Sequence, residues 1–359
     1  MTFSRSTPFN QLSPLPPAGI DLESKAILKA TISAHSALGE LRGMGAVIPN
    51  QNLILRSIAM QEARLSSEIE NIVTTSDEVY RAMEDDASKY DPATKEVMRY
   101  QEALWHGVEA IKNRPLRVSL FVEIVSILKN EPVGLRVKPG TRISDGKDGV
   151  LYTPPEGEFT IREKLEALEQ FLEHDQELDP LIKMAVAHYQ FEAIHPFSDG
   201  NGRTGRILNI LYLLQQGLLS APVLYLSRYI IQNKNAYYDG LRAVTEDGAW
   251  EPWILYILSG VKLTAEAASN QIKNIRMGLE EFRDQISTKA PKIYSLDLVH
   301  LLFQQPYCRI LDLERAGLAK RETASKYLQT LADLGLLKPV RVGTQVLYLN
   351  PVLLNILAN

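Results

Sequence analysis

The chain has 359 residues and a formal net charge of −4, because its 43 Asp and Glu residues outnumber its 39 Lys and Arg residues. This length predicts two or three domains. The slight acidity excludes a global positive field of the kind that draws proteins to nucleic acid. The single cysteine, Cys308, excludes an internal disulfide framework and indicates a reducing compartment.

The segment from Met1 to Gly19 is rich in Pro, Ser and Thr and lacks the apolar run of a signal peptide. We therefore expect residues 1–20 to form an extended arm. No apolar run elsewhere approaches the length of a membrane span. Together with the single cysteine, these features predict a cytoplasmic protein that makes no contact with membranes.

Helical spacing of apolar residues predicts a series of helices after the arm. The predicted helices cover residues 21–41, 77–83, 92–113, 117–129, 160–174 and 180–191, and another begins at Pro49-Asn50. Ser66 and Glu70 lie four residues apart near the end of this last helix, so one helical face presents both side chains. Spacing alone indicates no more than a charged helix end there.

Residues 133–155 interrupt the helical pattern, because four glycines alternate there with apolar and β-branched residues. This pattern predicts a β-hairpin in which residues 135–143 pair with residues 149–153. An isolated hairpin is only marginally stable, so we expect it to lie on the helical body. Pro154-Pro155 then stiffens the exit from the second strand.

The segment from His195 to Arg206 reads HPFSDGNGRTGR and has the inventory of a phosphate site. Its glycines let backbone N–H groups approach an anion, and a helix beginning near Gly202 presents unpaired N–H groups to it. Arg203 and Arg206 lie on one face of the first turn, where each guanidinium can fork onto phosphate oxygens. Asp199 can hold Mg²⁺ between two phosphates, and His195 can move a proton.

The C-terminal part changes character after a closing helix at 253–266 and a charged connecting helix at 261–290. Short helices predicted at 296–303, 310–317 and 319–334, with a hairpin within 340–348, indicate a winged helix-turn-helix. Residues 292–359 hold eight Lys or Arg and five Asp or Glu, a net of +3. Lys320, Arg321 and Lys326 lie near the start of the third helix, and contact with DNA or with protein stays open.

The segment from His195 to Arg206 resembles the signature of the Fic family, His-x-Phe-x-Asp/Glu-Gly-Asn-Gly-Arg-x-x-Arg, and matches it at every fixed position. This family mostly transfers AMP from ATP to a hydroxyl side chain of a target protein. The resemblance implies a mainly α fold, a Fic-fold helical bundle with a β-hairpin flap. It also implies His195 as the catalytic base and Asp199 as the Mg²⁺ ligand. The residues that it implies for ATP binding are Glu70, His195, Gly200, Asn201, Gly202, Arg203, Thr204, Gly205, Arg206, Tyr237 and Tyr238.

Three further features match patterns of the same family. Ser66, Glu70 and Asn71 fit Ser/Thr-x-x-x-Glu-Gly/Asn, the pattern of an inhibitory helix, and this implies that Glu70 pairs with Arg206 and misdirects bound ATP. The hairpin corresponds to a flap whose edge holds the target by main-chain pairing, which implies a docking role for Val150, Leu151 and Tyr152. Tyr237 and Tyr238 match a tyrosine pair beside the adenine, although two core tyrosines explain the pattern equally well.

The sequence therefore predicts a protein adenylyltransferase that modifies a Ser, Thr or Tyr hydroxyl of a target protein and of itself, with Mg²⁺ as cofactor. Alternatives are another phosphoryl-type transfer, AMP removal, or a DNA-binding regulator with a Fic sensor core. A homodimer and DNA are the further partners considered. The expected parts are the arm (1–20), a helical region with the inhibitory helix (21–113), the Fic core (114–260), a helical connector (261–290) and the winged helix (291–359).

Overall fold

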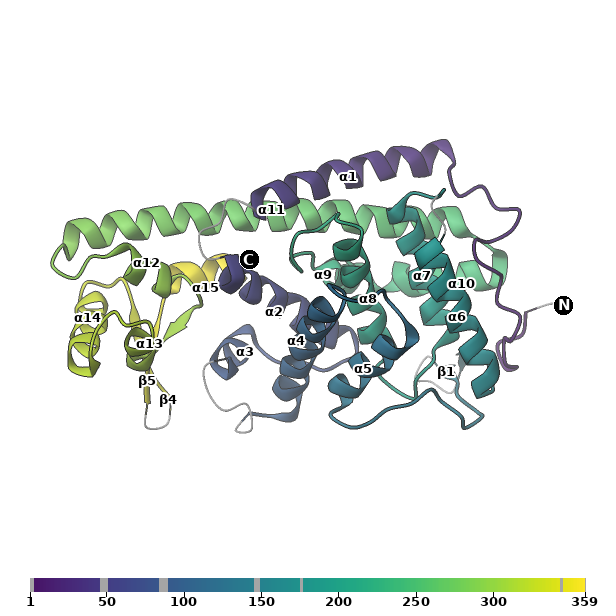
Figure 1. Cartoon of the computed structure of the whole chain (residues 1–359), viewed down its shortest axis with the longest axis horizontal. Helices are drawn as coiled ribbons and strands as arrows, with labels where there is room; N and C mark the ends of the chain where they lie inside the picture. Colours follow the sequence, from purple (N-terminus) through teal and green to yellow (C-terminus); the bar gives the residue numbers. More distant parts are fainter. Residues whose placement is uncertain are drawn as a thin grey trace.

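The computed structural model describes residues 3–45, 51–83, 90–144, 149–174, 177–342 and 345–358. The molecule is mostly helical and carries two small antiparallel sheets (Figure 1). This confirms the predicted fold class of a helical body with a β-hairpin. Within the described ranges, no helix combines the length and the apolar character that crossing a membrane requires.

Ten helices precede the long helix of the molecule in the described part of the chain. They are α1 (Lys25–Gly45), α2 (Gln51–Ile69), α3 (Ser76–Ala82), α4 (Pro92–Ala110), α5 (Val118–Lys129), α6 (Glu158–His174), α7 (Pro180–Ile194), α8 (Asn201–Gln215), α9 (Leu226–Gln232) and α10 (Lys234–Asp247). Most bounds agree with the predicted ranges within a few residues. The predicted start at Pro49-Asn50 lies outside the described residues, and α9 was not predicted.

Capping residues explain several of these bounds. Asp91 and Asp179 each precede a proline, and their carboxylates accept hydrogen bonds from the backbone N–H groups of Thr94 (3.0 Å) and Leu181 (2.8 Å). An Asp cap followed by Pro is the expected helix start, because Pro has no N–H to leave unsatisfied. Helix α1 begins four residues later than the predicted 21–41, because Ser24 caps it, and it runs four residues further, to Gly45.

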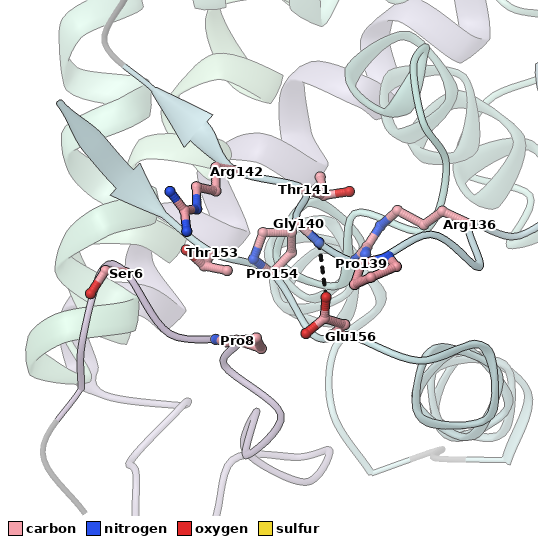
Figure 2. Close-up of a pocket in the computed structure, with 10 residues that line it drawn as sticks. All are labelled: Ser6, Pro8, Arg136, Pro139, Gly140, Thr141, Arg142, Thr153, Pro154 and Glu156. Atoms are coloured by element: carbon pink, nitrogen blue, oxygen red, sulfur yellow. Dashed lines mark hydrogen bonds between the residues drawn. The ribbon is translucent and has the colours of Figure 1, made fainter. Parts of the chain in front are cut away.

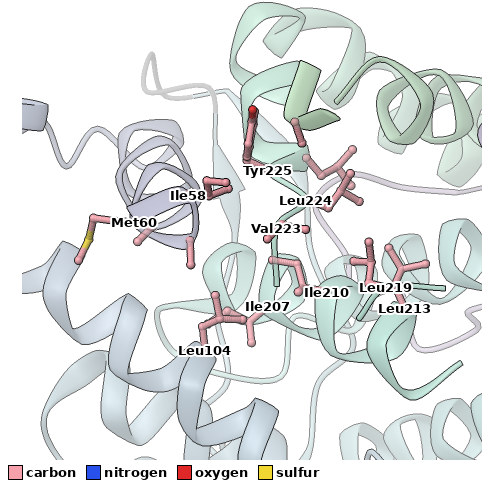
Figure 3. Close-up of a cluster of buried hydrophobic side chains, with 14 of the residues drawn as sticks. Ile58, Met60, Leu104, Ile207, Ile210, Leu213, Leu219, Val223, Leu224 and Tyr225 are labelled. Carbon is pink, nitrogen blue, oxygen red and sulfur yellow. The ribbon is translucent and has the colours of Figure 1, made fainter. Parts of the chain in front are cut away.

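The main core lies where α2, α4 and α8 meet the segment that leads into α9 (Figure 3). Ile58 of α2, Leu104 of α4 and Ile207 of α8 are all fully buried. Burying such a side chain contributes about 1.5–3 kcal/mol. Nearly every residue of α8 from Arg203 onward is buried. Helix α8, which begins inside the signature loop, is therefore packed against other elements on several sides.

The closing helix and the charged connector are a single helix, α11 (Trp250–Lys289), of 40 residues. The prediction of two elements was wrong because the buried stripe continues without a break from Trp253 to Ile286. Gly260 does not interrupt it, because Leu226 and Tyr229 pack where a side chain would stand. The purple α1 lies along α11 in Figure 1, so two long helices form one side of the molecule.

The C-terminal part contains the three predicted helices α12 (Leu296–Leu302), α13 (Ile310–Arg315) and α14 (Arg321–Asp333), with α15 (Pro351–Ala358) after them. The predicted hairpin consists of β4 (Lys338–Val342) and β5 (Gln345–Leu349), and β5 also pairs with β3 (Tyr307–Cys308). The sequence pattern missed β3 and α15. Cys308 is buried in β3 opposite Tyr348.

The hairpin near the middle of the chain is much shorter than predicted. It consists of β1 (Ile143–Ser144) and β2 (Val150–Tyr152), with Ile143 opposite Tyr152, and its predicted turn lies in the undescribed residues 145–148. Residues 135–142 are not a strand. Pro139 supplies no N–H group for a ladder, and the backbone N–H of Arg136 donates to the carbonyl of Pro196 instead (2.9 Å).

Candidate active site

The end of α2 presents Ser66 and Glu70 to the signature loop. Asn71 has φ of 63°, in the left-handed region that Asn tolerates better than most residues. The N–H of Ile72 then donates to the carbonyl of Ser67 (3.0 Å), which closes the helix end. The local backbone conformation therefore explains why the predicted pattern has Asn at this position. It ends the helix directly after Glu70 and leaves that carboxylate on the last turn.

Arg206 of α8 binds this helix end with its guanidinium. Its Nε donates to Ser66 Oγ (2.7 Å), and its Nη2 donates to Ser66 O (2.9 Å) and Glu70 Oε1 (2.9 Å). Burial works against the charge of Arg206, yet the Glu70 carboxylate raises its pKa. Burial alone would raise the pKa of Glu70, but the charge and hydrogen bond of Arg206, together with the charge of Arg203, lower it. Both groups are therefore charged at neutral pH, and the expected pair is present.

His195 is the residue directly after α7. Its backbone is left-handed, with φ of 48° and ψ of 59°, and its N–H donates to the carbonyl of Phe191 (3.0 Å). Burial lowers the pKa of the imidazole to about 4, and the nearby charge of Arg136 adds to this effect. The ring is therefore neutral at physiological pH. A neutral imidazole that lines a cavity can accept a proton.

The loop between α7 and α8 is shaped by Asn201. Its side-chain oxygen accepts from the N–H of Phe197, and its nitrogen donates to the carbonyl of Phe197, both at 2.8 Å. The Asn201 side chain thus bonds both backbone groups of one residue, as a neighbouring β-strand does, and these bonds fix the conformation of the loop. Gly200 precedes α8 with φ of 83°, where a side chain would be strained. In the structure the Asn201 amide stabilises the loop through its two hydrogen bonds with Phe197. The ATP-binding role that the resemblance implied for Asn201 stays a prediction.

Arg203 and Asp199 lie beside the N-terminus of α8. Arg203 Nη1 donates to Glu96 Oε2 of α4 (2.7 Å), and its Nη2 is 3.9 Å from Asp199 Oδ1. Asp199 forms an ion pair with Lys129 at the end of α5. Burial tends to raise the pKa of Asp199, but the hydrogen bond and charge of Lys129 lower it. The carboxylate is therefore ionised.

A cavity of about 240 Å³ lies between the loop, the hairpin and α10. Of the predicted site residues, its wall contains Glu70, Leu151, Tyr152, His195, Gly202, Arg206, Tyr237 and Tyr238. A Cβ atom on Gly202 would collide with Glu70 Oε1 and lie 2.9 Å from Arg206 Nη1. The close approach of α2 to α8 thus requires glycine at this position.

The remaining predicted residues are not part of this wall as described. They are Ser66, Asn71, Val150, Asp199, Gly200, Asn201, Arg203, Thr204 and Gly205. Thr204 is fully buried, and Gly205 packs closely against Phe191 and Glu192 of α7. Ser66 and Asn71 lie at the end of α2, and Val150 lies in β2. The other residues lie in the first turns of α8 or directly before that helix.

The tyrosine pair of α10 has one buried and one exposed member. Tyr237 is buried, and its hydroxyl lies 2.9 Å from His188 Nε2. Tyr238 keeps 43% of its surface exposed, and its ring centroid is 5.2 Å from that of Tyr237. An exposed aromatic face at a cavity can stack on a base. The geometry therefore suits Tyr238 to this role better than Tyr237.

The hairpin is fastened to the loop by Tyr152. Its hydroxyl donates to the carbonyl of Ala193 (2.8 Å), two residues before His195. Leu151 and Tyr152 face the cavity, whereas Val150 does not line it. The hairpin thus covers one side of the cavity, and its position is coupled to the end of α7.

Two residues of the site were missed in the sequence. Glu192 lines the cavity, and burial raises its pKa to about 7; its Oε1 has no hydrogen-bond partner among the described residues. The three-residue spacing from His195 on a helix was a usable signal for it. Arg136 donates from Nε to the carbonyl of His195 (2.6 Å), and from Nη2 to those of Pro155 (2.6 Å) and Ile194 (3.1 Å). No local pattern pointed to Arg136.

The metal-binding side chains at the loop suit a metal ion that is also coordinated by the phosphates of a bound nucleotide. Among the residues that the structure describes, no group of three or more His, Cys, Asp or Glu side chains could hold a metal ion alone. Asp199 offers one ionised carboxylate with 59% of its side chain exposed. Mg²⁺ commonly binds through one or two carboxylates together with substrate phosphates and water. The site therefore fits Mg²⁺ that arrives with a nucleotide.

Comparison with known proteins places these features in one family. The models described as Fic/DOC family N-terminal and Fic/DOC family match residues 28–109 and 115–213. The model described as Protein adenylyltransferase SoFic-like, C-terminal domain matches residues 279–353. A probable protein adenylyltransferase from Aquifex aeolicus is 28% identical over 197 residues, which are 54% of this chain and 56% of that protein.

Other relatives agree with this match. Protein adenylyltransferase fic-1 from Caenorhabditis elegans is 32% identical over 108 residues, which are 30% of this chain and 20% of that protein. The chain thus spans about half or less of the length of these curated relatives.

Solved structures show the same fold. A Fic family protein from Desulfovibrio desulfuricans has a TM-score of 0.59 at 22% identity, with 94% of this chain and 98% of that chain covered. A fragment of Fic-1 from Caenorhabditis elegans has a TM-score of 0.54 at 20% identity, with 70% and 74% covered. From its signature loop, its fold and the three matching models, we conclude that this chain belongs to the Fic/DOC family.

Proposed function

We propose that this chain is a protein adenylyltransferase, which moves AMP from ATP to a Ser, Thr or Tyr hydroxyl of a target protein and of itself. The observation that carries the proposal is that neutral His195 and charged Arg206 line one cavity together with residues of the hairpin. The names of the curated relatives support AMP transfer as the reaction class.

In the proposed reaction, His195 accepts the proton of the target hydroxyl. The hydroxyl oxygen forms a bond to the α-phosphorus of ATP, and the bond from that phosphorus to the oxygen that bridges to the β-phosphate breaks, so pyrophosphate leaves. The N–H groups at the start of α8, with Arg203 and Arg206, stabilise the phosphate charge. Bound Mg²⁺, held by Asp199, would neutralise further charge on the phosphates.

Glu70 is the proposed inhibitor of this reaction. Its carboxylate binds the guanidinium that a γ-phosphate would need, at 2.9 Å, and its negative charge repels phosphate from the same place. ATP that binds beside Glu70 therefore has its α-phosphorus badly aimed. A misdirected substrate can lose orders of magnitude in rate while binding is almost preserved.

The experiment incubates the purified chain with labelled ATP and compares it with Glu70→Gly. We expect the variant to raise self-modification or target modification by about tenfold or more, while ATP affinity rises less. The double variant Glu70→Gly with Arg206→Ala should lose this gain, because the gain needs a freed Arg206. A gain that survives loss of Arg206 refutes the pairing as the inhibitory contact.

Mass analysis of the modified protein distinguishes AMP transfer from the other reactions of such a loop. A mass increase of AMP on a hydroxyl residue supports the proposal, whereas an increase of phosphate alone contradicts it. Glu68→Gly, two residues earlier on α2, is the matched control because its carboxylate pairs with Arg64 at 2.8 Å and does not line the cavity. It should leave transfer unchanged.

We further propose that α12 to α14 with β4 and β5 form a winged helix. Lys320, Arg321 and Lys326 are exposed at the start of α14, as a helix that enters a DNA groove would require. Binding of duplex DNA that weakens steeply with salt, and that is lost in the triple alanine variant of these residues, would support contact with DNA. Absence of binding at low salt would favour a protein partner.

A further inference from the structure

The N-terminal arm, residues 3–13, lies across the hairpin. Phe3 is part of the wall of the active-site cavity. Its ring lies nearly parallel to that of Tyr152, with centroids 6.3 Å apart, and at right angles to that of Phe9, with centroids 5.3 Å apart. Phe9 also packs edge-on against Tyr152. Two aromatic side chains of the arm thus enclose the hairpin tyrosine that lines the site.

Main-chain groups join the arm to the end of the hairpin. The N–H of Phe9 donates to the carbonyl of Thr153 (3.0 Å), and the Thr153 hydroxyl donates to the carbonyl of Arg5 (2.7 Å). The N–H of Glu156 donates to Asn10 Oδ1 (2.8 Å). One main-chain hydrogen bond and two bonds that involve side chains therefore join the arm, which turns at residues 5–7 and 10–11, to the residues directly after β2.

A second contact fixes the arm on the opposite side of the cavity. Arg5 forms an ion pair with Glu246 of α10, with Nη2 and Oε1 2.7 Å apart. Glu246 lies one helix turn beyond the cavity-lining residue Arg242. The arm consequently bridges the hairpin and α10, the two elements that border the opening of the cavity.

The arm is not packed tightly against the body along its whole length. Ser6 and Pro8 form one wall of a second cavity of about 300 Å³, in which they face Thr153 and Pro154 (Figure 2). Arg5, Ser6, Thr7 and Pro8 are all exposed. Leu12 at the end of the arm is buried in the core, so the part of the arm that can leave at low cost is the segment before it, which has few buried contacts.

We propose that the arm is an intramolecular occupant of the surface on which the target docks. This rests on the proposed function, because it takes the hairpin to be the docking element. The corresponding partner is an extended protein segment with an aromatic side chain for the position of Phe3 and a backbone N–H for the carbonyl of Thr153. Such a segment and the arm exclude each other, so docking requires release of the arm.

The test is a competition that needs no catalysis. A fluorescent peptide with the sequence of residues 1–13 is titrated into the full chain without ATP, and binding is followed by anisotropy. The tethered arm is present at an effective concentration of about millimolar, so the wild type should bind the peptide weakly. Phe3→Ala with Phe9→Ala should bind it about tenfold more tightly, because the tethered competitor loses its two aromatic contacts.

Charge reversal provides a second route that leaves the aromatic residues intact. Arg5→Glu repels Glu246 and should tighten peptide binding about threefold. Adding Glu246→Arg re-forms the ion pair of the tethered arm and repels Arg5 of the peptide, so peptide binding should return to the wild-type strength or become weaker. Thr7→Ala, on the exposed side of the arm, is the matched control and should change nothing. Equal melting temperatures would show that every variant is folded.

Several outcomes would overturn the proposal. Peptide binding of equal strength by wild type and variants would show that the arm does not occupy the surface. If peptide binding stays as tight in Arg5→Glu with Glu246→Arg as in Arg5→Glu alone, the arm has another role. A change in ATP affinity without a change in peptide binding would lead to the same conclusion. Peptide competition as expected, in a chain that modifies no protein, would instead refute the proposed function and leave the occupancy of the surface standing.

Discussion

The surroundings of His195 keep its imidazole neutral, as the proposed role of a general base requires. Burial lowers its pKa to about 4, so the imidazole is unprotonated throughout the physiological range. The left-handed backbone at this residue turns the chain out of α7 and into the loop. The chemistry of the ring thus depends on where the helix ends.

Replacing His195 separates proton transfer from nucleotide binding. In the Glu70→Gly background, His195→Ala should reduce transfer by about 10²–10⁴-fold, because general base catalysis has this magnitude. ATP affinity should stay within about twofold, since the loop and the arginines bind the phosphates. Calorimetric titration with ATP measures the second quantity, and a folded variant that no longer binds ATP contradicts this division of roles.

The pH dependence of the same reaction follows from the direction of the shift in pKa. His195 must be unprotonated to accept a proton, and burial lowers its pKa from the ordinary value of 6.5 to about 4. The kcat/KM of Glu70→Gly should therefore stay flat as pH falls from 7 to 5, and decline only as pH approaches about 4. A decline centred near pH 6.5 would show that the imidazole is not desolvated as described.

Arg136 stabilises the backbone turn that follows α7. Its guanidinium donates to the carbonyls of His195, Ile194 and Pro155, so one side chain joins the catalytic turn to the exit of the hairpin. Carbonyls at a helix C-terminus lack partners within the helix, and a cation there is favourable. Arg136 is a positioning residue, because it touches the backbone of His195 and not the cavity.

Loss of Arg136 should misplace the imidazole. In the Glu70→Gly background we expect Arg136→Ala to reduce kcat by about 10–100-fold with little change in ATP affinity, because small displacements of a catalytic group are costly. Arg136→Lys should recover little, since an ammonium cannot fork to carbonyls on two segments. Lys138→Ala, on the exposed part of the same segment, is the control, and an equal loss of kcat there would contradict the assignment.

At the scale of elements, α2 serves both the core and the site. Glu62 is fully buried on this helix, where it accepts hydrogen bonds from the hydroxyl of Tyr100 (3.1 Å) and the N–H of Ser227 (3.1 Å). Two turns later the same helix presents Glu70 to Arg206. Contacts of Glu62 with α4 and α9 therefore help to fix the helix that carries the proposed inhibitor.

Glu62 makes stability depend on pH. Burial raises its pKa from 4.5 to about 7, so the folded chain keeps a proton that the unfolded chain loses. The free energy of unfolding should therefore fall as pH rises from about 4.5 to about 7, by about 1–3 kcal/mol. Glu62→Gln should flatten this fall in thermal unfolding experiments across the window. Glu68→Gln on the same helix is the matched control, and an unchanged slope in Glu62→Gln contradicts the assignment.

At the scale of the whole molecule, α11 belongs to both the catalytic body and the C-terminal part. Trp253 near its start is buried beside α7, and Phe282 near its end is buried against Phe303. The C-terminal part also contacts the N-terminal helices, since the hydroxyl of Tyr307 donates to Asp77 of α3. We therefore expect the described parts to unfold together, in one transition.

Gly278 tests this coupling. A Cβ atom there would lie 2.9 Å from Ile356 Cδ1 and 3.3 Å from Val352 Cγ1, so Gly278→Leu forces α15 away from α11. Overpacking of this kind costs about 1–3 kcal/mol. The melting temperature of the single transition should fall, whereas Met277→Ala at the exposed neighbouring position should have little effect. Two separate transitions, with only one of them shifted, would contradict the coupling.

The sequence by itself determined the local chemistry of this protein. The spacing within HPFSDGNGRTGR, the Asp-Pro helix starts and the Asn after Glu70 each act through neighbours within a few residues, so their pattern is sufficient. The helix starts and ends followed from these patterns, whereas the reaction class followed from the resemblance of the segment to the Fic signature. The strand predicted at 135–143 failed because Arg136 binds a loop some 60 residues away, which no local pattern records.

Only the tertiary structure decided which distant residues meet. Glu70 and Arg206 are 136 positions apart, and Arg136 meets His195 across 59 positions. Phe3 reaches the cavity from an arm whose composition predicted only an extended segment. Such contacts depend on how buried faces pack between helices, and the same local pattern is compatible with many such packings. The local sequence therefore defines which chemical groups the loop contains, and the folded chain decides which distant residues pair with them.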